Sequence, residues 1–251
     1  MKSGHTTTIQ SVDRAIMVLR CFDRGEKLGI TEISRRLGLH KSTAFGLVNT
    51  LAENKLLEQD PETGRYFLGI GLFRLSANVQ IGIRELGAPF VKRLVEHTGE
   101  TVNLVVRDES YVVYIEKLES PHSMRICTRI GQRLPMYCTA VGKAMLAWLP
   151  PEEAAAILDS ARMTAYTENT ITTRAALRTE LQKIRDDGYA IDDEELELGL
   201  VCVAVPIRDA AGRPVAALSV SGPKQRMTSE HIEAIRKALT SEAAAMSREL
   251  R

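Results

Sequence analysis

The sequence lacks the long apolar runs that mark membrane-spanning and secreted proteins. No stretch of its 251 residues approaches the roughly 18 consecutive apolar residues of a membrane span. Near the N-terminus there is no apolar core followed by a small-residue cleavage site, which is the pattern of a secretory signal. We therefore expect a cytoplasmic protein with no membrane partner.

Cysteine is also scarce, and its spacing argues against the usual cysteine chemistry. The four cysteines are far apart and none forms a CxxC pair, so we expect neither a disulfide framework nor a structural zinc site. No motif ties Cys138 or Cys202 to a base such as His97 or His122. The sequence therefore predicts no metal, no cofactor and no enzymatic activity.

No large excess of one charge is present, and the net charge is +1. Residues 1–80 carry 11 basic and 8 acidic side chains, whereas the remainder carries 22 and 24. This weak basic bias has the sign expected of an N-terminal DNA-binding domain. The 44% apolar content suffices for the cores of two modest domains.

The pattern of residues 1–70 predicts a winged helix-turn-helix domain. Apolar residues recur with helical period in three segments, and two strand-like runs then flank a turn that contains Pro61 and Gly64. Thr31 is the expected N-cap of the second helix, and Gly38 is its expected end. The expected elements are helices over 11–22, 31–37 and 41–53, and strands over 56–59 and 65–68.

The third predicted helix has one apolar face and one polar face. Ala44, Leu47, Val48 and Leu51 stand at i, i+3, i+4 and i+7, which predicts that they face the core. In a helix-turn-helix the second helix of the pair enters the major groove. The side chains left facing outward, and so expected to meet DNA, are those of Lys41, Ser42, Thr43, Phe45, Asn49 and Thr50, together with the bare backbone of Gly46.

These outward residues have chemistry suited to a duplex. The start of the helix, at Lys41 and its neighbours, suits phosphate oxygens. Asn49 can pair with an adenine edge, and Phe45 can touch a thymine methyl. Further backbone contacts are expected from Arg35 and Arg36 on the preceding helix and from Arg65 in the wing. An ordinary solvated helix face would show similar polar residues, so this pattern alone leaves both interpretations open.

Residues 71–82 are predicted to form a linker helix, and residues 83–251 a second domain in which strands and helices alternate. Strands are expected over TVNLVV, YVVYIEK, MRICTRI, VCVAVPI and PVAALSV, with a short strand-like YAI. Helices are expected over 83–97, 139–149 and 174–187, and from 229 to the end. The second of these stops before Pro150 and Pro151.

Two features of the second domain could hold a small molecule. Thr139 can cap a helix whose first amides, those of Ala140, Val141 and Gly142, would then attract a carboxylate or phosphate. A plain capped helix is the alternative interpretation. Period-two alternation places Ser219 and Ser221 on one face of a late strand. In the strand before it, Cys202 shares a face with Ala204. Asp192, which follows YAI in an acidic run, can point inward.

Three long segments, in this order, resemble the IclR family of bacterial transcriptional regulators. The first comprises ITEISRRLGLHKSTAFGLVNTL and GRYFLGIGLFRL, the second is RIGQRLPMYCTAVGKAMLAWLP and the third is GLVCVAVPIRDAAGRPVAALSVSGP. The resemblance implies an α+β protein with a GAF-like effector-binding domain, a homodimer or dimer of dimers, and a palindromic or near-palindromic operator. It also implies a small carboxylate effector, as in regulators of sugar-acid and small carboxylic-acid catabolism.

The resemblance also implies which residues would hold the effector. The matched positions are Ala140, Val141, Asp192, Leu200, Cys202, Ser219 and Ser221, with Met124 closing one side. At Gly46 the sequence departs from the arginine that many family members carry in the recognition helix.

The leading hypothesis is therefore a ligand-responsive repressor or activator of a catabolic operon. The alternative hypothesis is a metabolite-binding module that acts mainly through protein partners and retains a weak DNA-binding head, as the glycine at position 46 would suggest.

Overall fold

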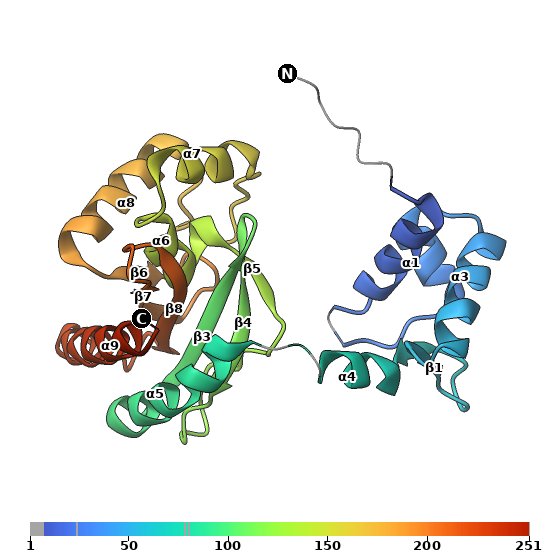
Figure 1. The fold of residues 1–251 in the computed structure, drawn as a ribbon, viewed down its shortest axis with the longest axis horizontal. Helices are drawn as coiled ribbons and strands as arrows, with labels where there is room; N and C mark the ends of the chain where they lie inside the picture. The colour runs from blue at the N-terminus through green and yellow to red at the C-terminus, as the bar shows by residue number, and fades with distance from the viewer. Residues whose placement is uncertain (1–7, 24, 78, 80, 251) are drawn as a thin grey trace. The chain divides into compact units, whose positions relative to one another are not determined.

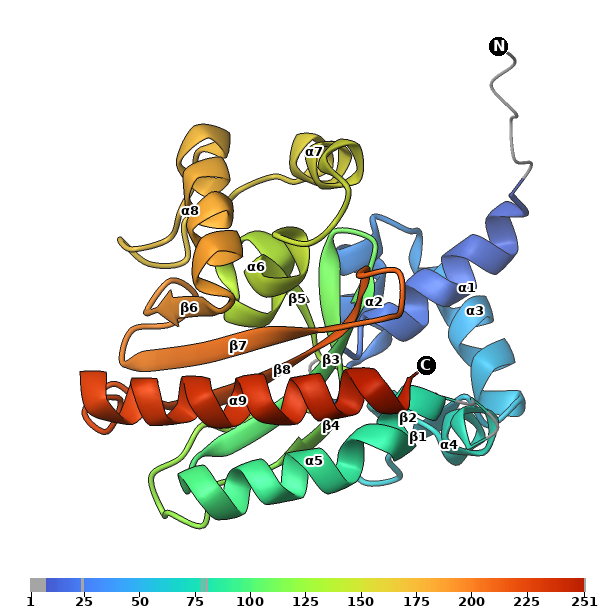
Figure 2. The ribbon, with the colours of Figure 1, turned by 60° about the vertical axis from the view of Figure 1, so that its left-hand side comes forward.

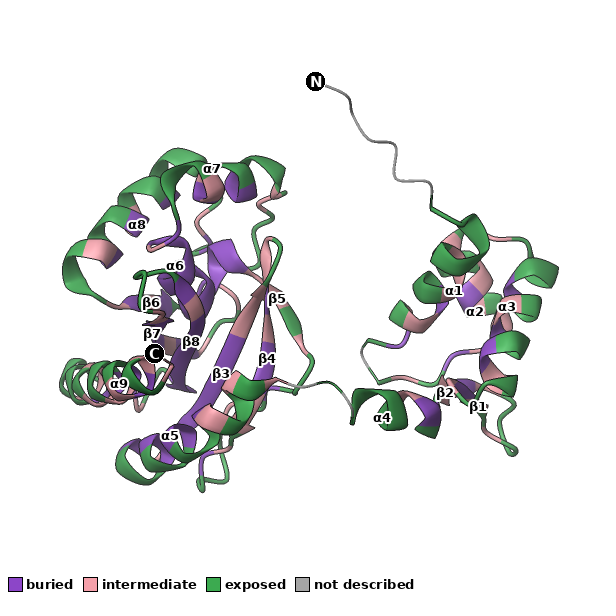
Figure 3. Ribbon diagram, in the orientation of Figure 1, coloured by how far each residue is buried: buried purple, intermediate pink, exposed green. Residues whose placement is uncertain are grey.

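The chain forms two compact units, Met1–Gln80 and Ile81–Arg251 (Figure 1). The computed structural model describes residues 8–23, 25–77, 79 and 81–250. Each unit has its own core of buried apolar residues. Figure 3 shows buried residues in both units. The two units are therefore described one at a time.

The first unit is a three-helix bundle with a hairpin. Its helices are α1 (Gln10–Arg20), α2 (Ile30–Leu37) and α3 (Lys41–Glu53), and the strands β1 (Leu57–Gln59) and β2 (Tyr66–Leu68) pair antiparallel. Leu28 adds an isolated antiparallel bridge to Tyr66. Its core is formed by Val18, Phe22, Leu28, Ile33, Val48, Leu51, Leu57 and Tyr66. This order of elements confirms the predicted winged helix-turn-helix.

The start of α2 differs from the prediction. The helix begins at Ile30, and Gly29 rather than Thr31 is its N-cap. A glycine has no side chain to cap with, so Glu32 takes over by accepting the Gly29 N–H at 2.8 Å. The end of the helix is as predicted, because Gly38 adopts a left-handed conformation with φ of 62°.

The segment after the hairpin forms a shorter helix than predicted. α4 spans Ile70–Ser76, against an expected 71–82, and residues 78 and 80 of that range lie outside the described residues. The start of α4 packs against the turn after α3. A Cβ on Gly69 or Gly71 would overlap the backbone of Lys55, so this close approach requires glycine at both positions.

The second unit contains one antiparallel sheet of six strands in the order β5-β4-β3-β8-β7-β6. The strands are β3 (Thr101–Asp108), β4 (Tyr111–Leu118), β5 (Arg133–Pro135), β6 (Ala190–Asp193), β7 (Leu200–Arg208) and β8 (Pro214–Pro223). The first strand of the unit, β3, thus pairs with its last strand, β8, at the centre of the sheet. This sheet, with helices on both faces, fits the predicted GAF-like α+β fold.

Helices cover both faces of this sheet (Figure 2). One face packs on α5 (Gly82–Thr98) and α9 (Ser229–Glu249), and the other on α6 (Ala140–Leu146), α7 (Pro151–Ser160) and α8 (Arg174–Asp187). A short 3-10 turn, η1 (Met136–Cys138), leads into α6. Since side chains alternate along a strand, Val203 and Leu218 face α5 and α9, whereas Ala204 and Ala217 face α6.

Two predictions for this unit were wrong or incomplete. Residues 124–130, expected as a strand, form an irregular segment, and the edge strand is instead β5. The helix α7 was not predicted, although Pro151 at its first position and acidic Glu152 and Glu153 in its first turn are typical of a helix start. Within the described residues, no helix is both long enough and apolar enough to cross a membrane.

Candidate DNA-reading helix and effector cavity

The polar face of α3 is exposed, as its periodicity predicted. Ala44 and Val48 are fully buried and Leu51 nearly so, whereas Phe45 remains 53% exposed. The exposed side of the helix carries Lys41, Ser42, Thr43, Phe45, Gly46, Asn49 and Thr50. The structure thus places every side chain predicted on this helix for DNA contact on one accessible surface of the first unit.

A residue that sequence reasoning missed organises the start of α3. His40 is the N-cap, and its Nδ1 accepts the Ser42 N–H at 3.4 Å and lies 2.8 Å from Ser42 Oγ. Histidine is an uncommon N-cap, so its position before the helix gave little signal. The first turn of α3 contains no acidic residue, which leaves its amides and Lys41 as a positive end.

The predicted arginine contacts divide into two groups. The guanidinium of Arg36 binds both carboxylate oxygens of Glu26, at 3.2 and 2.9 Å. Arg65 lies 2.6 Å from Glu32 Oε2 and also donates to Lys27 O at 2.9 Å, so it joins the wing to α2. Arg35 and Lys41 are exposed and form no ion pair with another described residue. The structure therefore leaves these two cations accessible beside the α3 surface.

The second unit contains a small cavity between the sheet and the segments around α6. Its volume is about 70 Å³. A single water molecule needs roughly 10–15 Å³ of cavity volume, so the cavity has room for a small metabolite. Of the nine residues predicted to hold an effector, six line it: Val141, Asp192, Leu200, Cys202, Ser219 and Ser221. The remaining lining residues are Tyr114, Ile126, Cys127, Thr128, Gln132, Leu134, Thr139, Leu196 and Glu197.

The three other predicted residues lie elsewhere. Met124 is 60% exposed, and its carbonyl accepts from Arg226. Ala140 is buried but does not line the cavity. Gly142 packs against Met136, where a Cβ would overlap the Met136 backbone, and its N–H donates to Thr139 Oγ1 at 3.2 Å. Gly142 is therefore explained by close packing and by the predicted Thr139 cap.

A buried amide that sequence reasoning missed links the polar groups of the cavity. Asn103 of β3 is fully buried, and its Nδ2 donates to Ser219 Oγ and Ser221 Oγ, both at 3.4 Å. Its Oδ1 accepts from Thr128 Oγ1 at 2.5 Å. The signal in the sequence was an asparagine inside the apolar run TVNLVV, because a buried amide needs several partners.

Asp192 is a buried carboxyl group in the cavity wall. It is 1% exposed, it stands opposite Cys202 across β6 and β7, and its Oδ1 accepts the Glu195 N–H at 2.8 Å. Burial raises the pKa of Asp192 to about 7, although the hydrogen bond from the Glu195 backbone opposes this shift. Near neutral pH, Asp192 can therefore both donate and accept a hydrogen bond.

A buried ion pair lies behind this wall. Lys143 of α6 is fully buried, pairs with Glu195 and lies 3.7 Å from Glu180 Oε1. Burial raises the pKa of Glu195, and Lys143 opposes that shift. Lys143 does not line the cavity, whose described lining contains two carboxyl groups, Asp192 and Glu197, and no cationic side chain.

Two cysteines beside the cavity, other than the exposed Cys127 in its lining, have the properties of inert thiols. Burial raises the pKa of Cys138 to about 12, and it raises the pKa of Cys202 as well. Only a thiolate is a good nucleophile or metal ligand, so neither cysteine is activated. Among the described residues there is also no group of three or more histidine, cysteine, aspartate or glutamate side chains placed to hold a metal ion.

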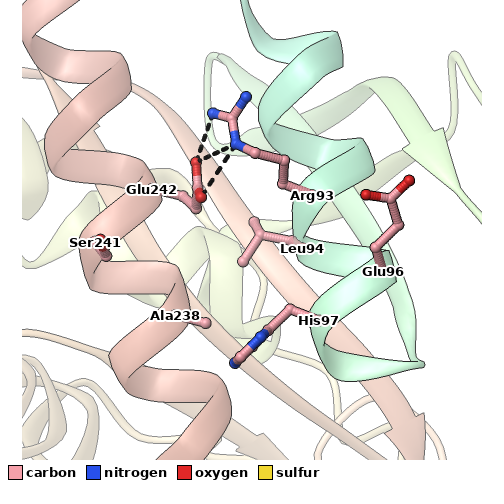
Figure 4. A pocket seen from close by; sticks show the side chains of 7 residues that line it. All are labelled: Arg93, Leu94, Glu96, His97, Ala238, Ser241 and Glu242. Atoms are coloured by element: carbon pink, nitrogen blue, oxygen red, sulfur yellow. Dashed lines mark hydrogen bonds and ion pairs between the residues drawn. The ribbon is translucent and has the colours of Figure 1, made fainter.

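A larger hollow, of about 500 Å³, is open to solvent between α5 and α9 (Figure 4). Its most prominent polar feature is the ion pair of Arg93 with Glu242, in which the closest atoms are 2.7 Å apart. His97 and Ala238 lie further along the same hollow. The polar groups of this hollow face solvent and do not converge on one point as those of the smaller cavity do. The hollow is therefore a weaker candidate for a ligand site.

A winged helix-turn-helix with an accessible helix face, followed by a domain with a partly enclosed cavity, defines a DNA-binding regulator of the ligand-responsive class. Comparison with known families gives the particular group. Residues 11–61 match the model of the IclR helix-turn-helix domain, and residues 76–248 match that of the bacterial transcriptional regulator IclR C-terminal domain. The chain belongs to the IclR family of bacterial transcriptional regulators.

Individual relatives support this assignment. The chain is 39% identical to the HTH-type transcriptional regulator XynR of Escherichia coli over 245 residues, which cover 96% of this chain and 97% of XynR. It resembles the crystal structure of an IclR regulator from Alicyclobacillus acidocaldarius, with a TM-score of 0.85, 31% identity and coverage of 96% and 99%. An IclR homologue from Microbacterium hydrocarbonoxydans complexed with 4-hydroxybenzoate is 27% identical, with a TM-score of 0.79 and coverage of 95% and 99%.

Proposed function

We propose that this protein is a cytoplasmic repressor or activator of catabolic genes that senses a small organic acid. The observation that carries the proposal is the cavity beside α6, where the Asn103, Ser219 and Ser221 network and the buried Asp192 converge on a partly enclosed space. The complex of the Microbacterium homologue with 4-hydroxybenzoate, which is an aromatic acid, supports an acidic effector.

The proposed contacts of the acid follow from the cavity lining. At the start of α6, Val141 lines the cavity, and its N–H precedes the first intrahelical bond, which runs from the Lys143 N–H to Thr139 O, so this N–H can receive a carboxylate. This amide matters more because the described lining has no cationic side chain. Ser219, Ser221 and Asp192 would bind hydroxyl or carbonyl groups, and Leu200 and Cys202 would pack against the carbon skeleton.

The exposed face of α3 is the proposed operator-binding surface. Lys41, Ser42 and Thr43 would contact phosphates, while Phe45 and Asn49 would reach base edges. Arg35 would add a backbone contact. Arg36 and Arg65 already bind Glu26 and Glu32, which favours a role in holding the first unit together and leaves them less free to clamp DNA.

We further propose a homodimer, or a dimer of dimers, on a palindromic or near-palindromic operator. The support is apolar surface on the first unit, since monomeric proteins rarely expose large apolar patches. On α4, Phe73 is 69% exposed and Leu75 is 62% exposed. On α1, Val12, Ile16 and Met17 are between 43% and 53% exposed. A second copy of the chain is the proposed partner of these side chains.

The proposal predicts that binding of DNA and binding of effector can be separated by mutation. In the double variant Ser219→Ala and Ser221→Ala, two cavity hydroxyls are lost while α3 is untouched. We expect this variant to shift DNA from the gene's own upstream region in an electrophoretic assay as well as wild type does. A screen of small organic acids should raise the melting temperature of wild type only, because ligand stabilises the state that binds it.

A regulator must also respond, so the acid found in the screen should change the DNA shift of wild type and not that of the double variant. A double variant that responds normally would show that the cavity is not the effector site. Wild type that ignores the upstream DNA at low salt, with and without the acids, would contradict the operator-binding role.

A further inference from the structure

Four side chains form a single exposed row along α3: Lys41, Phe45, Asn49 and Glu53. Because they are spaced by four residues, each lies one turn beyond the last on the same side of the helix. The row begins with a cation, continues with an aromatic ring and an amide, and ends with a carboxylate. DNA phosphates attract the first and repel the last, so the beginning and middle of α3 are the parts suited to enter a groove.

The amide in this row is held by the carboxylate that follows it. Asn49 Nδ2 donates to Glu53 Oε1 at 3.0 Å. A carboxylate can only accept a hydrogen bond, so it selects the nitrogen end of the amide over the oxygen end. An exposed asparagine without such a partner can turn either end toward a ligand. Glu53 therefore fixes the orientation of the Asn49 amide.

This orientation matches the edge of adenine in the major groove. A bidentate contact with adenine uses the amide oxygen as acceptor from N6 and one amide N–H as donor to N7. Since the amide has two N–H groups, the second remains for Glu53. Guanine offers acceptors at both N7 and O6, so it has nothing to donate to the amide oxygen.

We propose that Glu53 is a positioning residue that orients Asn49 toward adenine, and that Asn49 thereby specifies an A·T pair in each operator half-site. The inference rests on the proposed role of α3 as the DNA-reading helix. The neighbouring Thr50 does not compete for Asn49, because its hydroxyl donates to Gly46 O at 2.9 Å. The exposed face of α3 also carries no arginine that could read guanine at the same position.

The test begins with selection of binding sites by the full-length protein from duplex DNA with a randomised segment. Each position of the enriched site is then varied in competition assays with wild type, Asn49→Ala and Glu53→Ala. We expect one A·T pair per half-site at which wild type discriminates by roughly ten-fold. Both variants should lose this discrimination at that same base pair, and both should keep the base preferences at the other positions.

Asn54→Ala is the matched control. Asn54 is also an exposed asparagine at the end of α3, and its Nδ2 donates to Thr50 O at 2.8 Å. If Glu53 only stabilised the helix end, Glu53→Ala and Asn54→Ala would both weaken binding to all sequences alike. We expect Asn54→Ala to retain the preference for adenine in full.

Three results would overturn the inference. Glu53→Ala could keep the adenine preference that Asn49→Ala loses, which would remove the positioning role. The base pair whose recognition depends on Asn49 could be G·C, or no position could depend on Asn49 at all. Failure to enrich any sequence with wild type would be a distinct result, because it would contradict the DNA-reading role of α3 together with the inference.

Discussion

At the scale of single residues, the cavity depends on polar groups placed inside apolar strands. Burial of an amide or carboxyl group costs free energy unless it is hydrogen-bonded. Asn103 meets this requirement with Thr128, Ser219 and Ser221, and Asp192 meets it in part with the Glu195 N–H. The sheet tolerates these two residues because each is hydrogen-bonded to neighbouring groups in the wall of the cavity.

The raised pKa of Asp192 predicts a pH dependence of stability. In the folded protein this pKa is about 7, against an ordinary value of 3.8, so deprotonation costs more in the folded state than in the unfolded state. This difference in pKa lowers the free energy of unfolding as the pH rises from about 4 to about 7. From pH 5 to pH 8 the expected loss is roughly 2–3 kcal/mol.

Asp192→Asn should remove this part of the pH dependence, because an amide does not titrate in this range. Urea unfolding at pH 5 and pH 8, followed by the fluorescence of the single tryptophan, Trp148, reports on the second unit. Equal slopes of stability against pH in wild type and variant would show that Asp192 is ionised throughout. Asp193→Asn, at the neighbouring exposed carboxylate, is the control and should keep the slope of wild type.

At the scale of elements, α3 combines a stable core-facing side with a weak point in its exposed side. Ala44 and Val48 anchor it, and His40 caps it. Gly46, however, lies in the middle of the helix, where a glycine costs roughly 1 kcal/mol relative to alanine. A Cβ at this position would meet no atom within 4 Å apart from its two chain neighbours and the nearby backbone of α3 itself. The glycine is therefore not required by packing within the first unit.

Gly46→Ala should stabilise the first unit by roughly 0.5–1 kcal/mol, because it reduces the backbone entropy lost on folding without a clash. Slower hydrogen exchange of the α3 amides would confirm this expectation. Gly142→Ala is the contrasting variant, since a Cβ there would overlap the Met136 backbone, and it should destabilise the second unit. A loss of stability in Gly46→Ala would mean that the glycine has a structural role in α3.

Lys41→Ala should weaken binding to operator and to unrelated duplex DNA by similar factors. If Lys41 neutralises one phosphate, its removal lowers the slope of log affinity against log salt concentration by about one. Binding titrations between 50 and 200 mM salt measure this slope. Lys55→Ala, which removes an exposed cation in the turn after α3, is the control for net charge. An unchanged slope in Lys41→Ala would show that Lys41 contacts no phosphate.

At the scale of the whole molecule, regulation requires that effector binding in the second unit changes DNA binding by the first. The effector can shift this equilibrium only by the difference between its affinities for the two arrangements of the protein. The two units have separate cores, and the proposed homodimer or dimer of dimers would couple them. Apolar side chains on α1 and α4 supply the proposed contact surface.

Replacement of Phe73 by serine should weaken this assembly. Phe73 is 69% exposed on α4, so its loss removes little packing within the chain but much apolar area from a contact with a second copy. Light scattering after size exclusion should show a lower mass at the same concentration, and the affinity for a two-half-site operator should fall. Tyr166→Ser, at an exposed aromatic residue of the second unit, should leave the mass unchanged. A Phe73→Ser protein of wild-type mass would place the interface elsewhere.

Local patterns in the sequence determined much of this protein, because they act over a few residues. The period of Ala44, Leu47, Val48 and Leu51 predicted the buried face of α3, so its exposed face, the proposed DNA-reading surface, followed directly. The end of α2 at Gly38, the helix over 174–187 and the alternation along β7 and β8 were predicted for the same reason. The helix start at Val141 and the alternation of Ser219 and Ser221 pointed to three of the six predicted residues that line the cavity, whereas Leu200 followed only from the family resemblance.

Only the tertiary structure decided which distant residues meet. Asn103 lies more than 110 positions before Ser219, and Lys143 lies 52 positions before Glu195, so no local pattern could pair them. Likewise, the sequence offered Arg36 and Arg65 as free cations, whereas the fold brings each to a glutamate. Hydrogen bonds and ion pairs act over a few ångströms in space, and the distance along the chain does not limit them.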